Sequence, residues 1–180
     1  MKNLAMMALS FSVLISFANY GPTKTPRPIS VQAPTERSIQ EGINLEQKQR
    51  NYNRAIRIAR QTYRRNGCNG DFASATGRIA IDFGISPRVL SALVFVESSC
   101  NPNAVSGRRS VGLTQVNPIV WRYTQAELRD PERNLRIGAT ILSAYVHKFG
   151  LVEGLHHYNG LGNPTNSYAD KVLRAAGLKS

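Results

Sequence analysis

The sequence of 180 residues predicts an all-α fold, a compact helical domain built around one central, buried helix. Apolar residues recur at helical spacing along most of the chain, whereas alternating apolar and polar runs are scarce. Ser86-Pro87 and Asp130-Pro131 each place a capping side chain directly before a proline, which is a strong helix start. We expect at most a small β-hairpin, around residues 110–116. The length suits one domain, and a hydrophobic content of 42% suits a globular protein.

The first 18 residues predict a Sec signal peptide. Lys2 precedes an apolar run over residues 4–17, and small residues at Ser16 and Ala18 favour cleavage after Ala18. The run is short for a membrane span, which needs about 20 apolar residues, although an uncleaved anchor is the alternative. No cysteine lies near the cleavage site, so a lipoprotein is not expected. A periplasmic or secreted location follows.

Residues 19–43 predict a disordered linker, because four prolines stand among polar residues without apolar periodicity. The folded domain is expected over residues 44–180, beginning with an amphipathic helix over residues 45–65. One face of this helix carries Tyr52, Ala55, Ile56, Ala59 and Tyr63, and the other carries Arg50, Arg54, Arg57, Arg60 and Arg64. The arginines are either a solvated face or a contact for polyanions. A net charge of +12 favours a polyanionic partner, and export makes nucleic acid a poor one.

Six further helices are expected along the domain. They cover residues 72–83 with Asp71 as cap, 87–98, 118–122, 131–149, 152–157 and 167–176. The second is apolar nearly all round, as a central buried helix should be, and it carries Glu97 in its last turn.

Glu97 is the candidate catalytic residue. It ends an apolar run, and the polar loop that follows, residues 101–117, contains no acid. Desolvation and the negative end of the helix dipole both favour the protonated carboxyl, so the pKa of Glu97 should be raised. A proton held near neutral pH is what a general acid for glycoside cleavage requires.

Three blocks in order resemble the soluble lytic transglycosylase family. They are Glu97-Ser98-Ser99 with Asn101–Ser106 and Gly112-Leu113-Thr114-Gln115; Asp130-Pro131 with Asn134-Leu135 and Gly138-Ala139; and Tyr158-Asn159-Gly160 with Tyr168-Ala169. The resemblance extends over residues 85–172. It implies the fold of the lysozyme-like α+β superfamily, related to goose-type lysozyme. This sequence departs from the family pattern at Arg108-Arg109, Gly160 and His156-His157.

The resemblance also implies the reaction and the site. The family cleaves the MurNAc–GlcNAc β-1,4 bond of peptidoglycan and forms 1,6-anhydroMurNAc, with one acid, here Glu97, as general acid and base. Ser106, Gln115, Tyr158, Asn159 and Tyr168 match residues that bind substrate. Gln115 could instead satisfy buried backbone groups, and Tyr168 could be a core residue. A goose-type hydrolase and a non-catalytic wall-binding protein are the alternative functions.

The remaining expectations concern ligands and partners. Cys68 and Cys100 permit one disulfide, and free thiols are the alternative. His156-His157 lacks a third ligand at suitable spacing, so we expect neither a metal nor another cofactor. The expected partner is the peptidoglycan glycan strand, bound by a monomer. An accessory role in a conjugation or secretion apparatus or in a phage, or a housekeeping role, remains open.

Overall fold

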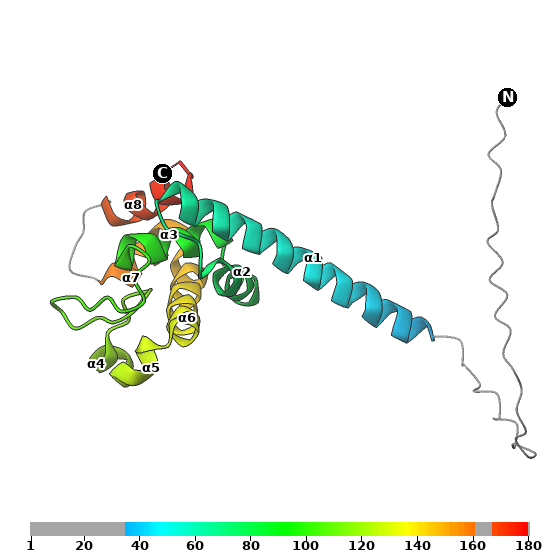
Figure 1. Ribbon diagram of the computed structural model, residues 1–180, viewed down its shortest axis with the longest axis horizontal. Coiled ribbons are helices and arrows are strands. Elements are labelled where there is room, and N and C mark those ends of the chain that lie inside the picture. Colours follow the sequence, from blue (N-terminus) through cyan, green and yellow to red (C-terminus); the bar gives the residue numbers. More distant parts are fainter. Residues whose placement is uncertain (1–34, 161–166, 180) are drawn as a thin grey trace, which may run out of the picture. The chain divides into compact units, whose positions relative to one another are not determined.

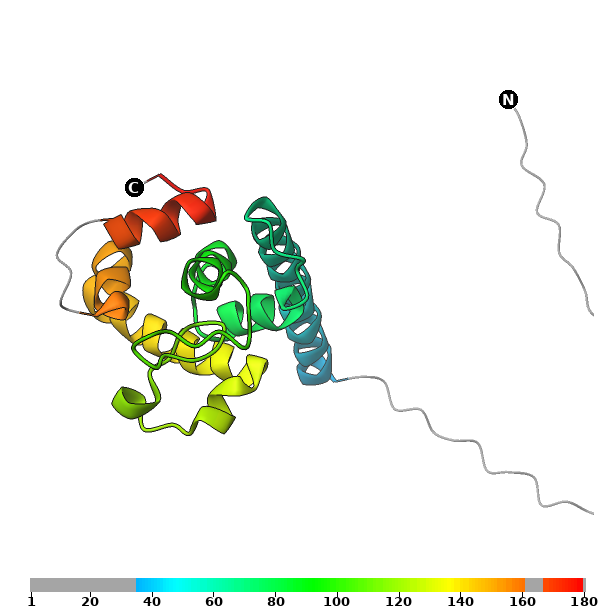
Figure 2. The ribbon, with the colours of Figure 1, turned by 60° about the vertical axis from the view of Figure 1, so that its left-hand side comes forward.

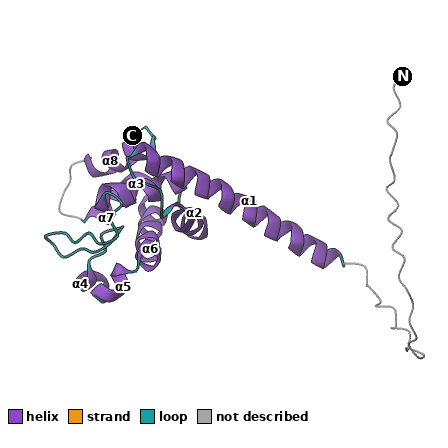
Figure 3. Ribbon diagram, viewed as in Figure 1, coloured by secondary structure: helices purple, strands orange, loops and turns teal. Residues whose placement is uncertain are grey.

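The computed structural model describes residues 35–160 and 167–179, and these contain eight helices and no strand. The helices are α1 (Glu36–Arg65), α2 (Ala73–Asp82), α3 (Pro87–Ser98), α4 (Pro118–Trp121), α5 (Gln125–Arg129), α6 (Pro131–Phe149), α7 (Leu151–Asn159) and α8 (Ser167–Ala176). The all-α prediction is therefore confirmed for the described residues (Figures 1 and 3). The predicted signal peptide and the linker up to residue 34 lie outside them. None of the helices described is both long and apolar enough to cross a bilayer.

Helix α1 begins well before residue 45, where the sequence predicted it to start. The prediction of an extended linker is wrong for residues 36–43, which belong to α1. No proline interrupts this segment, and Arg37 and Glu41, one turn apart, pair at 3.0 Å. Such pairs at i,i+4 spacing stabilise a helix that has no other support. Residues 35–51 are exposed, so this half of α1 extends beyond the packed domain (Figure 1).

The second half of α1 packs against α2 and α3, as its apolar face predicted. Ala59 and Tyr63 are buried there, and the Tyr63 hydroxyl shares a 2.7 Å hydrogen bond with the Thr76 hydroxyl of α2. A Cβ atom at Gly77 would lie 2.6 Å from the Ile56 backbone nitrogen. Only glycine therefore allows α1 and α2 to cross this closely.

Helix α3 is the central helix of the domain, as expected. All residues from Val89 to Val94 are buried, and α1, α2 and α8 pack around it (Figure 2). Burial of a side chain such as Leu90 or Leu93 contributes about 2 kcal/mol. Pro87 starts the helix, but the Ser86 hydroxyl makes no capping hydrogen bond. The burial of the run from Val89 to Val94 makes α3 a fixed support for Glu97.

Of the caps expected for α6 and α2, the first is present in the structure and the second is not. The Asp130 carboxylate accepts a 2.6 Å hydrogen bond from the Arg133 backbone N–H and caps α6, as predicted. Asp71, in contrast, does not cap α2, because its carboxylate is held by the Asn69 side chain at 2.6 Å. Helix α5 was not predicted, although Thr124 and Glu127 form a capping box that the sequence displays.

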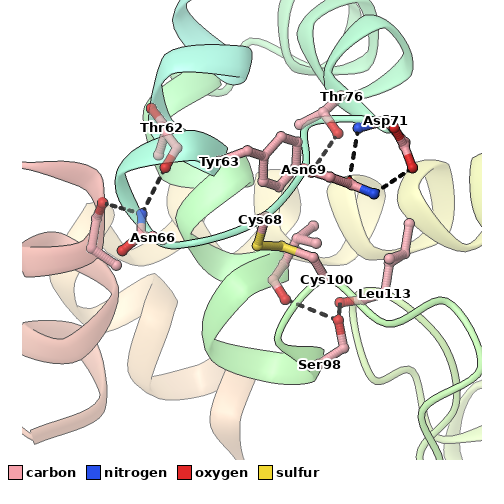
Figure 4. The surroundings of a disulfide bond; sticks show 12 residues. Thr62, Tyr63, Asn66, Cys68, Asn69, Asp71, Thr76, Ser98, Cys100 and Leu113 are labelled. Carbon is pink, nitrogen blue, oxygen red and sulfur yellow. Dashed lines mark hydrogen bonds between the residues drawn. A yellow bond between two sulfur atoms is a disulfide. The ribbon is translucent and has the colours of Figure 1, made fainter.

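Isolated β-bridges and one disulfide hold the segment between α3 and α4 in place. Val111 forms isolated antiparallel bridges with Val105 and Val116, which is all that the described residues show of the expected hairpin. Cys68 and Cys100 form a disulfide with Cα atoms 6.2 Å apart (Figure 4). It ties the chain after α1 to the chain after α3.

Candidate functional site

A cleft of about 440 Å³ lies beside the last turn of α3. It is lined by Glu97, Ser106, Gly107, Arg108, Ser110, Gln115, Tyr158 and Asn159. Five of the six predicted site residues therefore come together in one hollow, from α3, the loop after it and the end of α7. The sixth, Tyr168, reaches the same site from α8 by contacting Glu97.

Glu97 is held in place by the way α3 ends. The neighbouring Ser98 hydroxyl donates to the Val94 carbonyl at 3.0 Å and approaches the Leu113 carbonyl at 2.9 Å. Ser99 then adopts a left-handed conformation with φ of 50°, so the helix ends at Ser98, one residue after the acid. The carboxyl group therefore stands at a fixed point between the buried helix and the polar loop.

The surroundings of Glu97 favour its protonated form. Burial raises the pKa of Glu97 from 4.5 to about 6, and a hydrogen bond donated by the Tyr168 hydroxyl partly opposes this shift. Among the described residues that line the cleft, Glu97 is the one carboxylate. A carboxyl group that keeps its proton near pH 6 at the wall of a polar cleft can act as a general acid.

Two tyrosines lie near the Glu97 carboxyl group, and Tyr168 donates a hydrogen bond to it. The Tyr158 hydroxyl donates to the Thr114 carbonyl at 2.8 Å, which fixes its ring against the loop. Burial, and then the nearby Glu97 charge, raise the pKa of both tyrosines, so both remain neutral donors. Tyr168 is largely buried, so it is a core residue, and it also contacts the acid.

Ser106 and Gln115 stand on the loop and also support it. Ser106 is exposed, and its hydroxyl oxygen accepts a 3.0 Å hydrogen bond from the Ser110 backbone N–H. Within the described part of the chain the Ser106 hydroxyl only accepts a hydrogen bond, so its proton can be donated to a ligand. The Gln115 side-chain nitrogen donates to the carbonyls of Gly112 and Ala104, at 2.9 and 3.2 Å. Gln115 thus satisfies backbone groups, the alternative role that the sequence suggested, while it lines the cleft.

Asn134 is the residue whose role the sequence did not reveal. Its side chain, buried in α6, accepts from the Thr114 backbone N–H at 2.8 Å and from the Thr114 hydroxyl at 2.7 Å. Its amide nitrogen donates to the carbonyls of Val111 and Leu128, at 2.8 and 3.0 Å. Gly112 has φ of +81°, and a Cβ there would collide with the Asn134 amide. Asn134 therefore positions the loop that carries Gln115.

Of the two adjacent histidines, His157 packs against aromatic side chains of α6. The His157 ring stacks on Phe149 and Tyr145, with centroids 3.9 and 5.5 Å apart. Within residues 35–160 and 167–179, no group of three histidine, cysteine or acidic side chains could hold a metal ion. The described side chains that line the cleft offer one carboxyl group, several neutral polar groups and the Arg108 cation.

The sequence of this chain is similar to those of a known protein family. A family model described as "Transglycosylase SLT domain" matches residues 75–176, which include every lining residue of the cleft and Tyr168. The "Endo-type membrane-bound lytic murein transglycosylase A" of Cronobacter sakazakii is 38% identical over 85 residues, or 41% of each chain. The proteins of the same name from an Enterobacter species and from Salmonella paratyphi B are 36% identical over 85 residues and 37% over 73.

The matches to these relatives are partial. The chain spans 41% of the length of the Cronobacter and Enterobacter proteins and 36% of the Salmonella protein. The alignments cover 41% of this chain for the first two relatives and 34% for the third.

Proposed function

The chain belongs to the transglycosylase SLT domain family, and on this premise we propose that it is a peptidoglycan lytic transglycosylase that uses Glu97 as its single acid and base. The observation that carries the proposal is the raised pKa of Glu97 in a cleft whose described lining holds no second carboxylate. Two-carboxylate glycosidases need a second acid to activate water or to form a covalent intermediate. A site with one acid requires the substrate to supply the missing group.

In the first half of the reaction, Glu97 donates its proton to the oxygen of the MurNAc–GlcNAc β-1,4 bond. As the bond from that oxygen to C1 of MurNAc breaks, the carbonyl oxygen of the same sugar's N-acetyl group stabilises the positive charge on C1. The Tyr168 hydroxyl, already bonded to the carboxyl group, stabilises the Glu97 carboxylate that this step produces. Ser106 and Gln115 would orient the N-acetyl and hydroxyl groups of the sugar.

In the second half, the Glu97 carboxylate takes the proton of the 6-hydroxyl group of MurNAc. The 6-oxygen then bonds to C1 and neutralises the positive charge that the N-acetyl oxygen had stabilised, so Glu97 has regained its proton and no water is consumed. The 6-hydroxyl has an advantage over bulk water because it is already attached to the reacting sugar. The product is 1,6-anhydroMurNAc.

Product analysis tests this proposal directly. Digestion of purified peptidoglycan should release muropeptides that end in 1,6-anhydroMurNAc and are one water lighter than hydrolysis products. Mass spectrometry before and after borohydride reduction distinguishes the two, since only a hydrolytic end is reducible. Predominantly reducible ends would establish a goose-type hydrolase instead, and an undigested wall would support a non-catalytic wall-binding protein.

The pH dependence of cleavage should reflect the raised pKa of Glu97. The first step needs the protonated carboxyl, so kcat/KM should fall as the pH rises through about 6 rather than through 4.5. The Tyr168→Phe substitution removes a hydrogen bond that lowers this pKa, and the falling limb should move to higher pH. A pH–rate profile on soluble glycan strands measures both. A limb that moves to lower pH in Tyr168→Phe would contradict this role for the tyrosine.

We also infer that the enzyme is exported to the periplasm or secreted, where its wall substrate lies. The predicted signal peptide supports this location, and the Cys68–Cys100 disulfide suits an oxidising compartment.

A further inference from the structure

A second hollow lies beside the last turn of α3. It is separate from the cleft, and none of the predicted site residues lines it. This basic groove has a volume of about 490 Å³ and is lined by Asn66, Phe95, Val96, Ser99, Lys171, Arg174 and Ala175. Its apolar part comes from half-buried Phe95 and Val96, and its charge from exposed Lys171 and Arg174 on α8. None of the residues that line it is acidic, and neither cation forms a salt bridge with any described residue.

The three walls of the basic groove are cross-linked to one another. The Cys68–Cys100 disulfide joins the segments that carry Asn66 and Ser99, which lie two residues and one residue from the cysteines (Figure 4). The Asn66 side chain donates to the Ala175 carbonyl at 2.9 Å and so joins α1 to α8. Such links keep a binding surface in shape before a ligand arrives, which reduces the entropic cost of binding.

The basic groove and the cleft share two structural supports. Val96 lines the groove, whereas the next residue of α3, Glu97, lines the cleft. On α8, Tyr168 contacts Glu97, and Lys171 follows it by three residues, a rise of about 4.5 Å along the helix. Adjacent residues of an α-helix point about 100° apart, so the groove and the cleft lie on neighbouring sides of the end of α3. A chain attached to a sugar in the cleft would reach the groove by passing around this end of the helix.

We propose that the basic groove binds the acidic peptide carried by the muramic acid residue that occupies the cleft. This inference rests on the proposed function, since that peptide extends from the lactyl group of the substrate sugar. Its carboxylates match the unpaired charges of Lys171 and Arg174, and its alanine methyl groups match the apolar surface of Phe95 and Val96. The volume falls within the range of about 300–1,000 Å³ typical of small-ligand sites.

Binding of the peptide alone tests the groove without any need for catalysis. The probe is L-Ala-γ-D-Glu-meso-diaminopimelic acid, titrated into the protein and followed through the backbone amide NMR signals of Phe95 and Val96. These signals should shift in the wild type, and the Lys171→Gln/Arg174→Gln variant should bind about 5- to 10-fold more weakly, as expected for the loss of two exposed ion pairs. A matched control, Arg129→Gln/Lys148→Gln, removes two exposed charges elsewhere and should bind normally. Absent shifts, equal shifts with inorganic phosphate, or equal loss in the control would overturn the proposal.

Kinetics on two substrates separate this proposal from the proposed function. The Lys171→Gln/Arg174→Gln variant should lose kcat/KM about 5- to 10-fold on peptide-bearing strands and none on strands stripped of peptide by an amidase. The control variant should match the wild type on both. Normal cleavage of both substrates by the groove variant would overturn the peptide site and leave the transglycosylase standing. Equal losses on both would overturn it too, whereas a wild type inactive on both would contradict the proposed function itself.

Discussion

Replacement of Glu97 by glutamine is expected to reduce the cleavage of peptidoglycan by at least about 10²-fold, the lower end of general acid–base catalysis. Glutamine has nearly the same shape and can still accept the hydrogen bond from Tyr168. It cannot give a proton to the glycosidic oxygen or take one from the 6-hydroxyl. Release of soluble muropeptides from purified peptidoglycan measures the loss.

Stability should change in the opposite direction to activity in Glu97→Gln. A carboxyl whose pKa rises from 4.5 to about 6 on folding binds more protons in the folded state, so its contribution to stability falls as the pH rises from 4.5 to 6. At pH 7 the ionised group costs stability, and glutamine removes that cost. The variant should therefore melt no lower than the wild type. Glu153→Gln, an exposed acid of α7, serves as control and should retain activity; near-normal turnover by Glu97→Gln would refute the assignment.

The features that could be predicted from the sequence are those with local causes. Pro87 and the apolar run after it specify α3, and an acid at the end of that run can be recognised without any tertiary information. Asp130 and Gly150 likewise delimit α6, because a cap and a helix stop act on adjacent residues. The direction of the Glu97 pKa shift could also be predicted, because apolar residues on nearly all sides of its helix indicated that the helix is buried.

The features that escaped prediction depend on contacts between distant segments. The partner of Glu97, Tyr168, lies 71 residues along the chain, and the sequence could not distinguish its contact with the acid from simple core packing. Asp71 suits a cap by type, but its carboxylate is taken by Asn69. The basic groove combines α8, the end of α3 and the residue that follows α1, and no spacing in the sequence brings those together.

Asn134 shows the same limit most clearly, and its substitution is the second change with a large expected effect. Its buried amide makes four hydrogen bonds to Thr114, Val111 and Leu128, which hold the loop of the cleft on α6. At about 1 kcal/mol for each bond, Asn134→Ala should lower the free energy of unfolding by about 3–5 kcal/mol, because the partners remain buried. Urea denaturation measures this loss. Asn51→Ala, an exposed change on α1, should have little effect.

Asn134→Asp separates hydrogen bonding from packing, because aspartate has the same shape. The oxygen that replaces the amide nitrogen would face the carbonyls of Val111 and Leu128, so two attractive contacts become repulsive, while the contacts with Thr114 persist. We therefore expect Asn134→Asp to be at least as unstable as Asn134→Ala at neutral pH, despite filling the same volume. Below the temperature at which either variant unfolds, kcat should also fall, because Gln115 and the Thr114 carbonyl that binds Tyr158 lose their support. A stable, active Asn134→Asp enzyme would show that the buried amide fills space and does not position the loop.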